Sequence, residues 1–346
     1  TPSKFHYIFN LRDLSRIYEG LCQSIPDKYS DVTSFVRLFR NEALRVVHDR
    51  LISAEDKEFV DKKLLKQLIA NHFSSSVANT EQICADPILF GDYLDLDIHN
   101  AAAENLEIYQ DLQSYDNIRK IFDEILKKYN EENQSKQMNL VLFEDALEHL
   151  TRIHRILKIK RGNALLVGVG GSGKQSLTKL ATYAAGYQLF EISLTRNYGE
   201  NEFREDLKKL YSILGEGKKC TFLITDGHVK NESFLELINN MLTSGMVPAL
   251  FEEDEKLPLL DSVRDEVDKL GINPSKENCW NYFINRCRNN LHVVLAMSPA
   301  GDTLRKRCRN FPGMISNCVI DWFFPWPKDA LLAVAKHFLS DLSSSS

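Results

Sequence analysis

The sequence predicts an α/β fold in which a parallel sheet flanked by helices follows a separate α-helical subdomain. Up to about residue 130 the apolar side chains recur with the period of an amphipathic helix. From Leu140 onward, short apolar runs alternate with helical segments, a pattern typical of parallel strands that helices cover on both faces. The first of these runs leads into a glycine-rich segment and then a helix.

The N-terminal third is predicted to be helical, without strands. Asn10 is the expected N-cap of a helix over 11–22. Ser53, followed three residues later by Asp56, resembles a capping box at the start of another helix.

The rest of the chain is predicted to be an alternating α/β unit. An amphipathic helix is expected over 115–129, and the wholly polar run 130–137 is the expected linker. The predicted strands are 164–167, 189–193, 221–225, 291–297 and 318–323. The predicted helices between the third and fourth strands are 231–243, 257–270 and 276–289. The expected divisions are a helical subdomain over 1–113, the α/β unit over 114–327, and the start of a second helical subdomain over 328–346.

Composition excludes several classes of protein. The 43 Lys and Arg residues against 48 Asp and Glu give a formal net charge of −5, so no overall positive field favours nucleic acid. No apolar run approaches the roughly 20 residues of a membrane span. The seven scattered cysteines include no Cys-x-x-Cys pair, which indicates reduced thiols in a cytoplasmic compartment. Because the chain starts at Thr1 and its last predicted helix has no partner, we expect a fragment of a longer protein.

A glycine-rich motif after the first predicted strand indicates phosphate binding. Gly168, Gly173 and Lys174 have the spacing G-x-x-x-x-G-K, and Gly170, Gly171 and Ser172 lie between them. Such glycines let backbone N–H groups converge on phosphate oxygens, and the lysine supplies a full charge to the terminal phosphates. We therefore expect residues 168–174 to bind the phosphates of a nucleotide.

The metal-binding part of this motif is altered. The residue after the lysine normally offers Mg²⁺ a hydroxyl, but here it is Gln175, and the hydroxyl of Ser176 comes one position later. Asp226 ends an apolar strand and is the expected Mg²⁺ ligand through water. Sites of this kind that hydrolyse ATP carry a glutamate next, whereas this chain has Gly227, and His228 is a less favoured substitute base.

Two further segments carry candidate site residues. Ser298 follows the strand 291–297, at the place where a residue senses the γ-phosphate. The segment 302–309 is rich in cations, which indicates either a solvated helix face or an arginine finger for a nucleotide on a neighbouring module. Spacing alone does not choose among Arg305, Arg307 and Arg309.

Four segments resemble one known family. They are TPSKFHYIFNLRDLSR (1–16), GVGGSGKQSL (168–177), FLELINNMLTSGMVPALF (234–251) and DWFFPWP (321–327). Together they resemble the fourth AAA+ module of a dynein heavy chain, preceded by the small helical subdomain of the third module. The resemblance extends over essentially the whole chain. It implies an AAA+ P-loop fold and a six-module ring motor that hydrolyses ATP, mainly in its first module, and walks on microtubules through a stalk outside this segment.

The resemblance also implies roles for individual residues. Leu140, Val141 and Leu142 would pack on adenine, and residues 168–176 would hold the phosphates of ATP or ADP. Asp226 would approach Mg²⁺, and Ser298 would be the sensor. Arg12 would be the second sensor of the preceding module, and Arg307 the candidate finger for that same site, although Asn317 stands where some relatives carry an arginine.

Gln175 and Gly227 resemble the axonemal members of the family, which implies the cytoskeleton of the cilium or flagellum. The implied partners are the neighbouring modules of the same heavy chain, other dynein chains and microtubules. Three hypotheses remain open: a regulatory nucleotide-binding module with little or no hydrolysis, an active ATPase with a substitute base, and an empty structural spacer in the ring. A small-molecule kinase is a weaker fourth.

Overall fold

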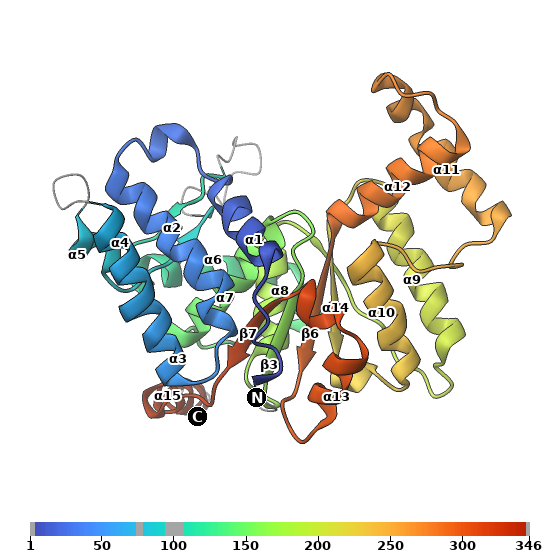
Figure 1. The fold of residues 1–346 in the computed structure, drawn as a ribbon. Coiled ribbons are helices and arrows are strands. Elements are labelled where there is room, and N and C mark those ends of the chain that lie inside the picture. The colour runs from blue at the N-terminus through green and yellow to red at the C-terminus, as the bar shows by residue number, and fades with distance from the viewer. Residues whose placement is uncertain (1–3, 74–78, 94–106, 344–346) are drawn as a thin grey trace. The chain divides into compact units, whose positions relative to one another are not determined.

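The chain forms two compact units, which are described separately. The computed structural model describes residues 4–73, 79–93 and 107–343. The first unit comprises Thr1–Arg155, Gly170–Ala184 and Asp321–Ser346, and the second comprises Ile156–Val169 and Ala185–Ile320. Figure 1 shows the elements of both. Each unit thus joins segments that are distant in the sequence, and the divisions expected at 113/114 and 327/328 stay predictions.

The first unit is mainly helical. Its helical elements are α1 (Leu11–Leu21), η2 (Pro26–Lys28), α2 (Val32–Val46), η3 (His48–Arg50), α3 (Ala54–Glu58), the π-helical η4 (Phe59–Leu65), α4 (Lys66–His72), α5 (Thr80–Cys84), α6 (Tyr115–Glu132), η5 (Gln134–Lys136), α7 (Glu144–Lys158), α8 (Lys174–Ala184) and α15 (Lys328–Ser343). Asn10 caps α1 in a capping box with Asp13, and the Ser53 hydroxyl accepts the N–H of Asp56 at 3.2 Å. Both predicted helix starts are therefore confirmed.

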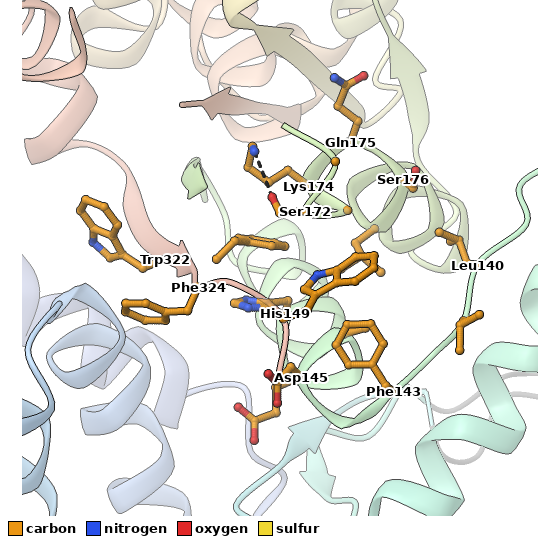
Figure 2. A pocket seen from close by; sticks show the side chains of 18 of the residues that line it. Leu140, Phe143, Asp145, His149, Ser172, Lys174, Gln175, Ser176, Trp322 and Phe324 are labelled. Atoms are coloured by element: carbon orange, nitrogen blue, oxygen red, sulfur yellow. Dashed lines mark hydrogen bonds between the residues drawn. The ribbon is translucent and has the colours of Figure 1, made fainter. Parts of the chain in front are cut away.

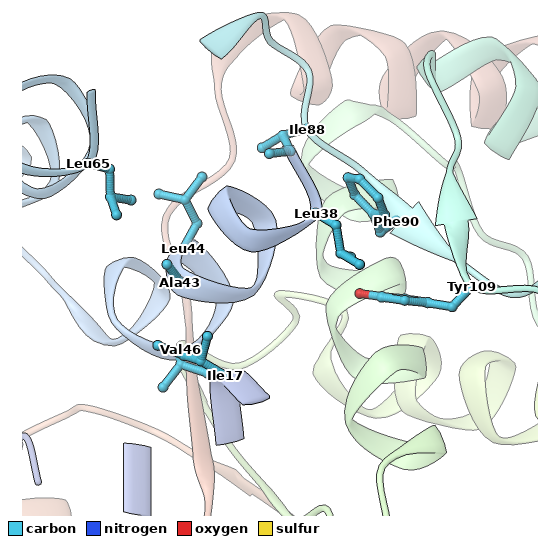
Figure 3. Close-up of a cluster of buried hydrophobic side chains, with 9 residues drawn as sticks. All are labelled: Ile17, Leu38, Ala43, Leu44, Val46, Leu65, Ile88, Phe90 and Tyr109. Atoms are coloured by element: carbon cyan, nitrogen blue, oxygen red, sulfur yellow. The ribbon is translucent and has the colours of Figure 1, made fainter. Parts of the chain in front are cut away.

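A cluster of buried apolar side chains packs α1, α2 and η4 of the first unit against the segment around β1 and β2. Figure 3 shows its members, which come from α1, α2, η4 and the segment around β1 and β2. The cluster consists of Ile17, Leu38, Ala43, Leu44, Val46, Leu65, Ile88, Phe90 and Tyr109. Their burial is the main stabilising term for helices that are too short to form alone.

The expectation that the N-terminal third contains no strand is wrong. Phe90–Gly91 (β1) pairs antiparallel with Gln110–Asp111 (β2). Two residues are too few to show the alternation by which a strand is recognised in a sequence. Arg37 of α2 reinforces this small ladder, because its Nε donates to Asp111 at 2.6 Å and its Nη2 donates to the Pro87 carbonyl at 2.8 Å.

A buried ion pair joins α2 to α7 inside the first unit. Glu42 is 0% exposed, and its carboxylate accepts from Nε of Arg155 at 3.2 and 3.1 Å and also from Nη2. The Tyr109 hydroxyl donates to Glu42 Oε1 at 2.7 Å, and the Asn41 amide donates to the same oxygen at 2.9 Å. A buried carboxylate with this many donors is satisfied only while all these elements stay in place.

The polar run 130–137 is not a linker. Its first residues complete α6, and η5 follows at once. The Asn130 side chain fixes the end of the run, since it accepts the Met138 N–H at 2.7 Å and donates to the Met138 carbonyl at 2.9 Å. Side-chain to backbone bonds of this kind let a segment without apolar anchors keep one conformation.

The second unit is built on most of a five-stranded sheet. The strands are β3 (Ala164–Gly168), β4 (Gln188–Phe190), β5 (Cys220–Thr225), β6 (Leu291–Met297) and β7 (Val319–Phe323), in the order β4-β5-β6-β3-β7. The pairs β4–β5, β5–β6 and β3–β6 are parallel, as predicted. The helical elements are α9 (Glu200–Gly215), η6 (Asp226–His228), α10 (Glu232–Ser244), α11 (Glu253–Lys269), α12 (Lys276–Asn290), α13 (Thr303–Asn310) and α14 (Gly313–Ser316).

Besides α6, two elements differ from the prediction by more than one residue at one end. The strand expected over 189–193 is only β4, and the helix expected from residue 257 begins earlier, at Glu253. The reason for the early start is a capping box in which the Glu255 side chain accepts the Glu252 N–H at 2.8 Å. An acidic run is stabilising at a helix N-terminus, where the helix dipole is positive.

The cysteines are mostly core residues, as predicted. Five of the seven thiols are buried, and none forms a disulfide. Burial raises the pKa of the Cys220 and Cys287 thiols to about 12. These thiols therefore stay protonated and unreactive near neutral pH.

Candidate functional site

The glycine-rich segment has the conformation that its sequence predicts. It follows the fully buried β3, and α8 begins at Lys174. Gly171 and Gly173 have φ angles of 76° and 91°, a region that side chains with a Cβ rarely adopt. A Cβ on Gly171 would meet nothing within 4 Å. A glycine is therefore favoured here by the positive φ angle of the backbone and not by a lack of space for a side chain.

Lys174 is held at the start of α8. The residue is 8% exposed, and its Nζ donates to the Ser172 hydroxyl at 3.1 Å. The Thr178 hydroxyl donates to the Lys174 carbonyl at 2.7 Å, which fixes the first turn of the helix. A lysine beside the free N–H groups of a helix N-terminus is a strong anion site.

A cavity of about 590 Å³ opens beside this loop within the first unit. Leu140 and Val141, predicted to pack on adenine, line it together with residues of the phosphate-binding loop. Phe143 and Trp326 also line it and contact each other edge to face at 5.2 Å. Figure 2 shows Leu140 and Phe143 on one side, Trp322 and Phe324 on the other, and Lys174 near Ser172. Aromatic walls beside a cationic loop suit a nucleotide, which joins a flat base to phosphates.

One wall of the cavity rests on charged residues that sequence reasoning did not assign. The His149 ring stacks on Phe323 at 3.7 Å, and its Nδ1 lies 2.7 Å from Asp321 Oδ2. Nη1 of Arg152 donates to Asp321 Oδ1 at 3.2 Å. In the sequence, the aromatic run that follows Asp321 could have pointed to this wall. That run is one of the segments on which the family resemblance depends, but the resemblance gives it no role.

The Asp321 contacts predict a pH dependence of stability. Burial alone would raise the pKa of Asp321, but the contacts with His149 and Arg152 outweigh it and hold the pKa below its usual value. Because the folded chain binds this proton less readily than the unfolded chain, the stabilisation is present above the unfolded carboxyl pKa of about 3.9 and is lost as pH falls through the lower folded value.

Asp321→Asn should therefore lower the unfolding free energy by about 1–3 kcal/mol at pH 7, and it should also flatten the loss of stability below pH ~4. Chemical denaturation at several pH values measures both effects. If the unfolding free energies of the variant and the parent chain change in parallel with pH, Asp321 does not contribute to the pH dependence of stability.

The strand-end residues predicted to serve the nucleotide lie in the second unit. Oδ2 of Asp226 accepts the backbone N–H of Ser298 at 2.6 Å, and Oδ1 accepts from Nη1 of Arg307 at 2.7 Å. The Nε of Arg307 donates to Glu232 at 3.1 Å. The structure thus brings Asp226, Ser298 and Arg307 together. The family resemblance implies Arg307 as a candidate finger for the site of the preceding module, and that role stays a prediction.

Within the second unit, both carboxylate oxygens of Asp226 already accept hydrogen bonds from the protein. Among the described residues, no group of three or more His, Cys, Asp or Glu side chains could hold a metal ion. The expectation that Asp226 binds Mg²⁺ through water stays a prediction that this geometry does not favour.

The other candidate residues are spread over both units. Arg12 lies exposed on the first turn of α1. Arg305 faces Asp302 at 3.7 Å, and Arg309 is exposed on α13.

Nδ1 of His228 accepts the Thr225 N–H at 3.2 Å. An imidazole that accepts at Nδ1 carries its proton on Nε2, so it has no lone pair left to act as a base while this contact lasts.

The parallel sheet, the glycine-rich loop between β3 and α8, and the lysine at the start of α8 define an AAA+ P-loop protein, a class that binds nucleotides. Comparison with known proteins places it more closely. Residues 138–346 match the family model of the P-loop containing dynein motor region D4, and residues 1–78 match that of the AAA+ lid domain. The chain belongs to the dynein heavy chain family.

Its relatives are axonemal. The chain is 57% identical over 340 residues to human dynein axonemal heavy chain 10, with 98% of the chain covered. It is 56% identical over 344 residues to the dynein-1-alpha heavy chain of the flagellar inner arm I1 complex of Chlamydomonas reinhardtii, with 99% covered. It spans about 7% of the length of these two relatives. This membership assigns the chain to the cytoskeleton of the cilium or flagellum.

No helix in the described part of the chain is both long and apolar enough to cross a bilayer.

Proposed function

We propose that this chain is a regulatory nucleotide-binding module of an axonemal dynein heavy chain, which holds ATP or ADP and hydrolyses it slowly or not at all. The observation that carries the proposal is an intact phosphate-binding loop beside a cavity of about 590 Å³, in a chain that has Gly227 at the place where sites that hydrolyse ATP are expected to carry a glutamate. Loss of a general base lowers the rate by about 10²–10⁴.

The parts of this proposal that concern the rest of the heavy chain rest on membership of the dynein heavy chain family. The module would be one arc of a ring, with neighbouring AAA+ modules as its direct partners. Microtubules would be reached through a stalk outside these residues, and other dynein chains would complete the arm. In this setting a nucleotide that stays bound stiffens the connection between the motor site and the stalk.

Two other functions compete with this proposal. An active ATPase needs a substitute base, and the hydrogen bond from Thr225 to His228 speaks against the nearest candidate. An empty ring spacer needs no phosphate-binding lysine, so the presence of Lys174 at the start of α8 disfavours it.

A single-turnover assay tests the proposal. Excess chain is mixed with trace Mg-ATP, and bound and hydrolysed nucleotide are followed for hours, with Lys174→Ala as the blank. Binding that depends on Lys174, with ATP persisting uncleaved, is the expected result. Prompt formation of ADP that is absent from the blank would show an active ATPase. A separate titration that finds no binding at millimolar ATP would show an empty spacer.

A further inference from the structure

Lys57 of α3 lines the same cavity of the first unit as Lys174 and the glycine-rich loop. Its side chain is partly buried, and its Nζ lies 4.4 Å from the centroid of the Phe324 ring. Figure 2 shows Phe324 on the cavity wall that faces Leu140. Within the part of the chain that the structure describes, this ammonium makes no hydrogen bond and no ion pair. The cavity therefore contains a second lysine that no carboxylate contacts directly.

The carboxylates that interact electrostatically with Lys57 are already held by arginines. They are Asp49, Glu148 and Asp321. Arg152 pairs with all three, at 3.3, 2.8 and 3.2 Å respectively. Arg45 also pairs with Asp49, at 3.2 Å. These contacts leave Lys57 as a cation whose ammonium has only an aromatic ring as its near neighbour.

The position of Lys57 has an energetic cost. Burial lowers the pKa of its ammonium, Arg152 lowers it further, and the attraction of the three carboxylates does not make up the difference. The charged form has thus lost contact with water without gaining an anion of its own. An anion in the cavity would compensate this loss, because opposite charges attract more strongly where water is partly excluded.

We propose that Lys57 is a second cation of the nucleotide site, whose charge attracts the phosphate chain of the nucleotide in this cavity. The inference rests on the proposed function and deepens it. Lys57 lies in the part of the chain that matches the AAA+ lid domain, whereas Lys174 lies in the part that matches the D4 region. A bound nucleotide is then held by both parts, and its binding stabilises the folded contact between them.

Calorimetric titration of the 346-residue chain with ATP and with ADP, for the parent chain and for Lys57→Met, tests the inference. Methionine keeps an unbranched apolar stem at this position and removes the charge. We expect the affinity for ATP to fall about tenfold, because a unit charge about 10 Å from a phosphate group in a partly shielded site contributes on this order. The affinity for ADP should fall less, since ADP carries less negative charge.

Two outcomes of this titration separate the inference from the proposed function. An unchanged affinity of Lys57→Met for ATP would overturn the inference and leave the proposed function standing. Absence of ATP binding by the parent chain would overturn both.

Lys63→Met is the matched control, because Lys63 is exposed on η4 and lies outside the residues that line the cavity. This control should bind ATP as the parent chain does. Lys57→Arg keeps the charge and should retain most of the affinity that Lys57→Met loses. A tenfold loss in the control as well, or equal losses for ATP and ADP in Lys57→Met, would overturn the role of Lys57 as a cation of the site.

Circular dichroism verifies that each variant folds, and a measurement on the parent chain decides if Lys57→Met does not fold. Acetic anhydride acetylates lysine amines, and peptide mass spectrometry measures the rates at Lys57 and Lys63 with and without saturating ATP. We expect ATP to slow acetylation of Lys57 by about threefold or more and to leave Lys63 unchanged, because an anion beside the ammonium favours its unreactive charged form. An unchanged rate at Lys57 while ATP is bound would overturn the inference.

Discussion

Lys174→Ala should lower the affinity of the chain for ATP by about 100-fold, which is about 2.7 kcal/mol. The lysine is the full positive charge of the phosphate-binding loop, and its Nζ is already positioned by the Ser172 hydroxyl at 3.1 Å. A substrate phosphate would replace this hydroxyl as the stronger acceptor.

Calorimetry with ATP measures this effect, and thermal unfolding without nucleotide verifies the fold. Lys179→Ala is the matched control, because Lys179 lies on the same helix but outside the residues that line the cavity. Equal affinities for Lys174→Ala and the parent chain would contradict the assignment of the loop as a phosphate site.

Glu42→Leu should destabilise the chain by about 3–5 kcal/mol, because it leaves the Arg155 guanidinium buried without its partner. Arg155 is 4% exposed, and the Glu42 carboxylate accepts from it and from Tyr109. Removing one member of a buried ion pair costs more than removing both, since the remaining charge keeps its desolvation penalty.

The double variant Glu42→Leu with Arg155→Met is the control, and it should recover a large part of the loss. The midpoint of chemical denaturation, followed by far-ultraviolet circular dichroism, measures both variants. A single variant as stable as the parent chain, or a double variant no better than the single one, would contradict a buried pair that stabilises the first unit.

Local patterns in the sequence predicted most of the fold. The strand expected over 291–297 coincides with β6, and Asn10 and Ser53 cap helices where their positions predict. The errors arise where structure depends on distant partners. The β1–β2 ladder has two residues per strand, and Arg37 holds it through contacts up to 74 residues away.

The same distinction explains the candidate site. The phosphate-binding loop is a local motif, so its glycines and Lys174 were found from spacing alone. The contact between Arg307 and Asp226 joins residues 81 positions apart, and that between His149 and Asp321 joins residues 172 apart. No local pattern encodes such pairs. From the sequence, the cationic segment 302–309 was therefore expected to be either a solvated helix face or an arginine finger, whereas Arg307 contacts two carboxylates of its own unit, Asp226 and Glu232.

The pair of Glu42 and Arg155 has a consequence for how such heavy chains diverge. Glu42 lies in the part that matches the lid domain, and Arg155 lies in the part that matches the D4 region. A crossover between two gene copies that falls between the codons for Glu42 and Arg155 would give a chain with only one of the two charged residues, unless both parent genes encode the same pair. Chimeric heavy chains should therefore be joined outside residues 42–155, and a change at either position should persist in a lineage only with a compensating change at the other.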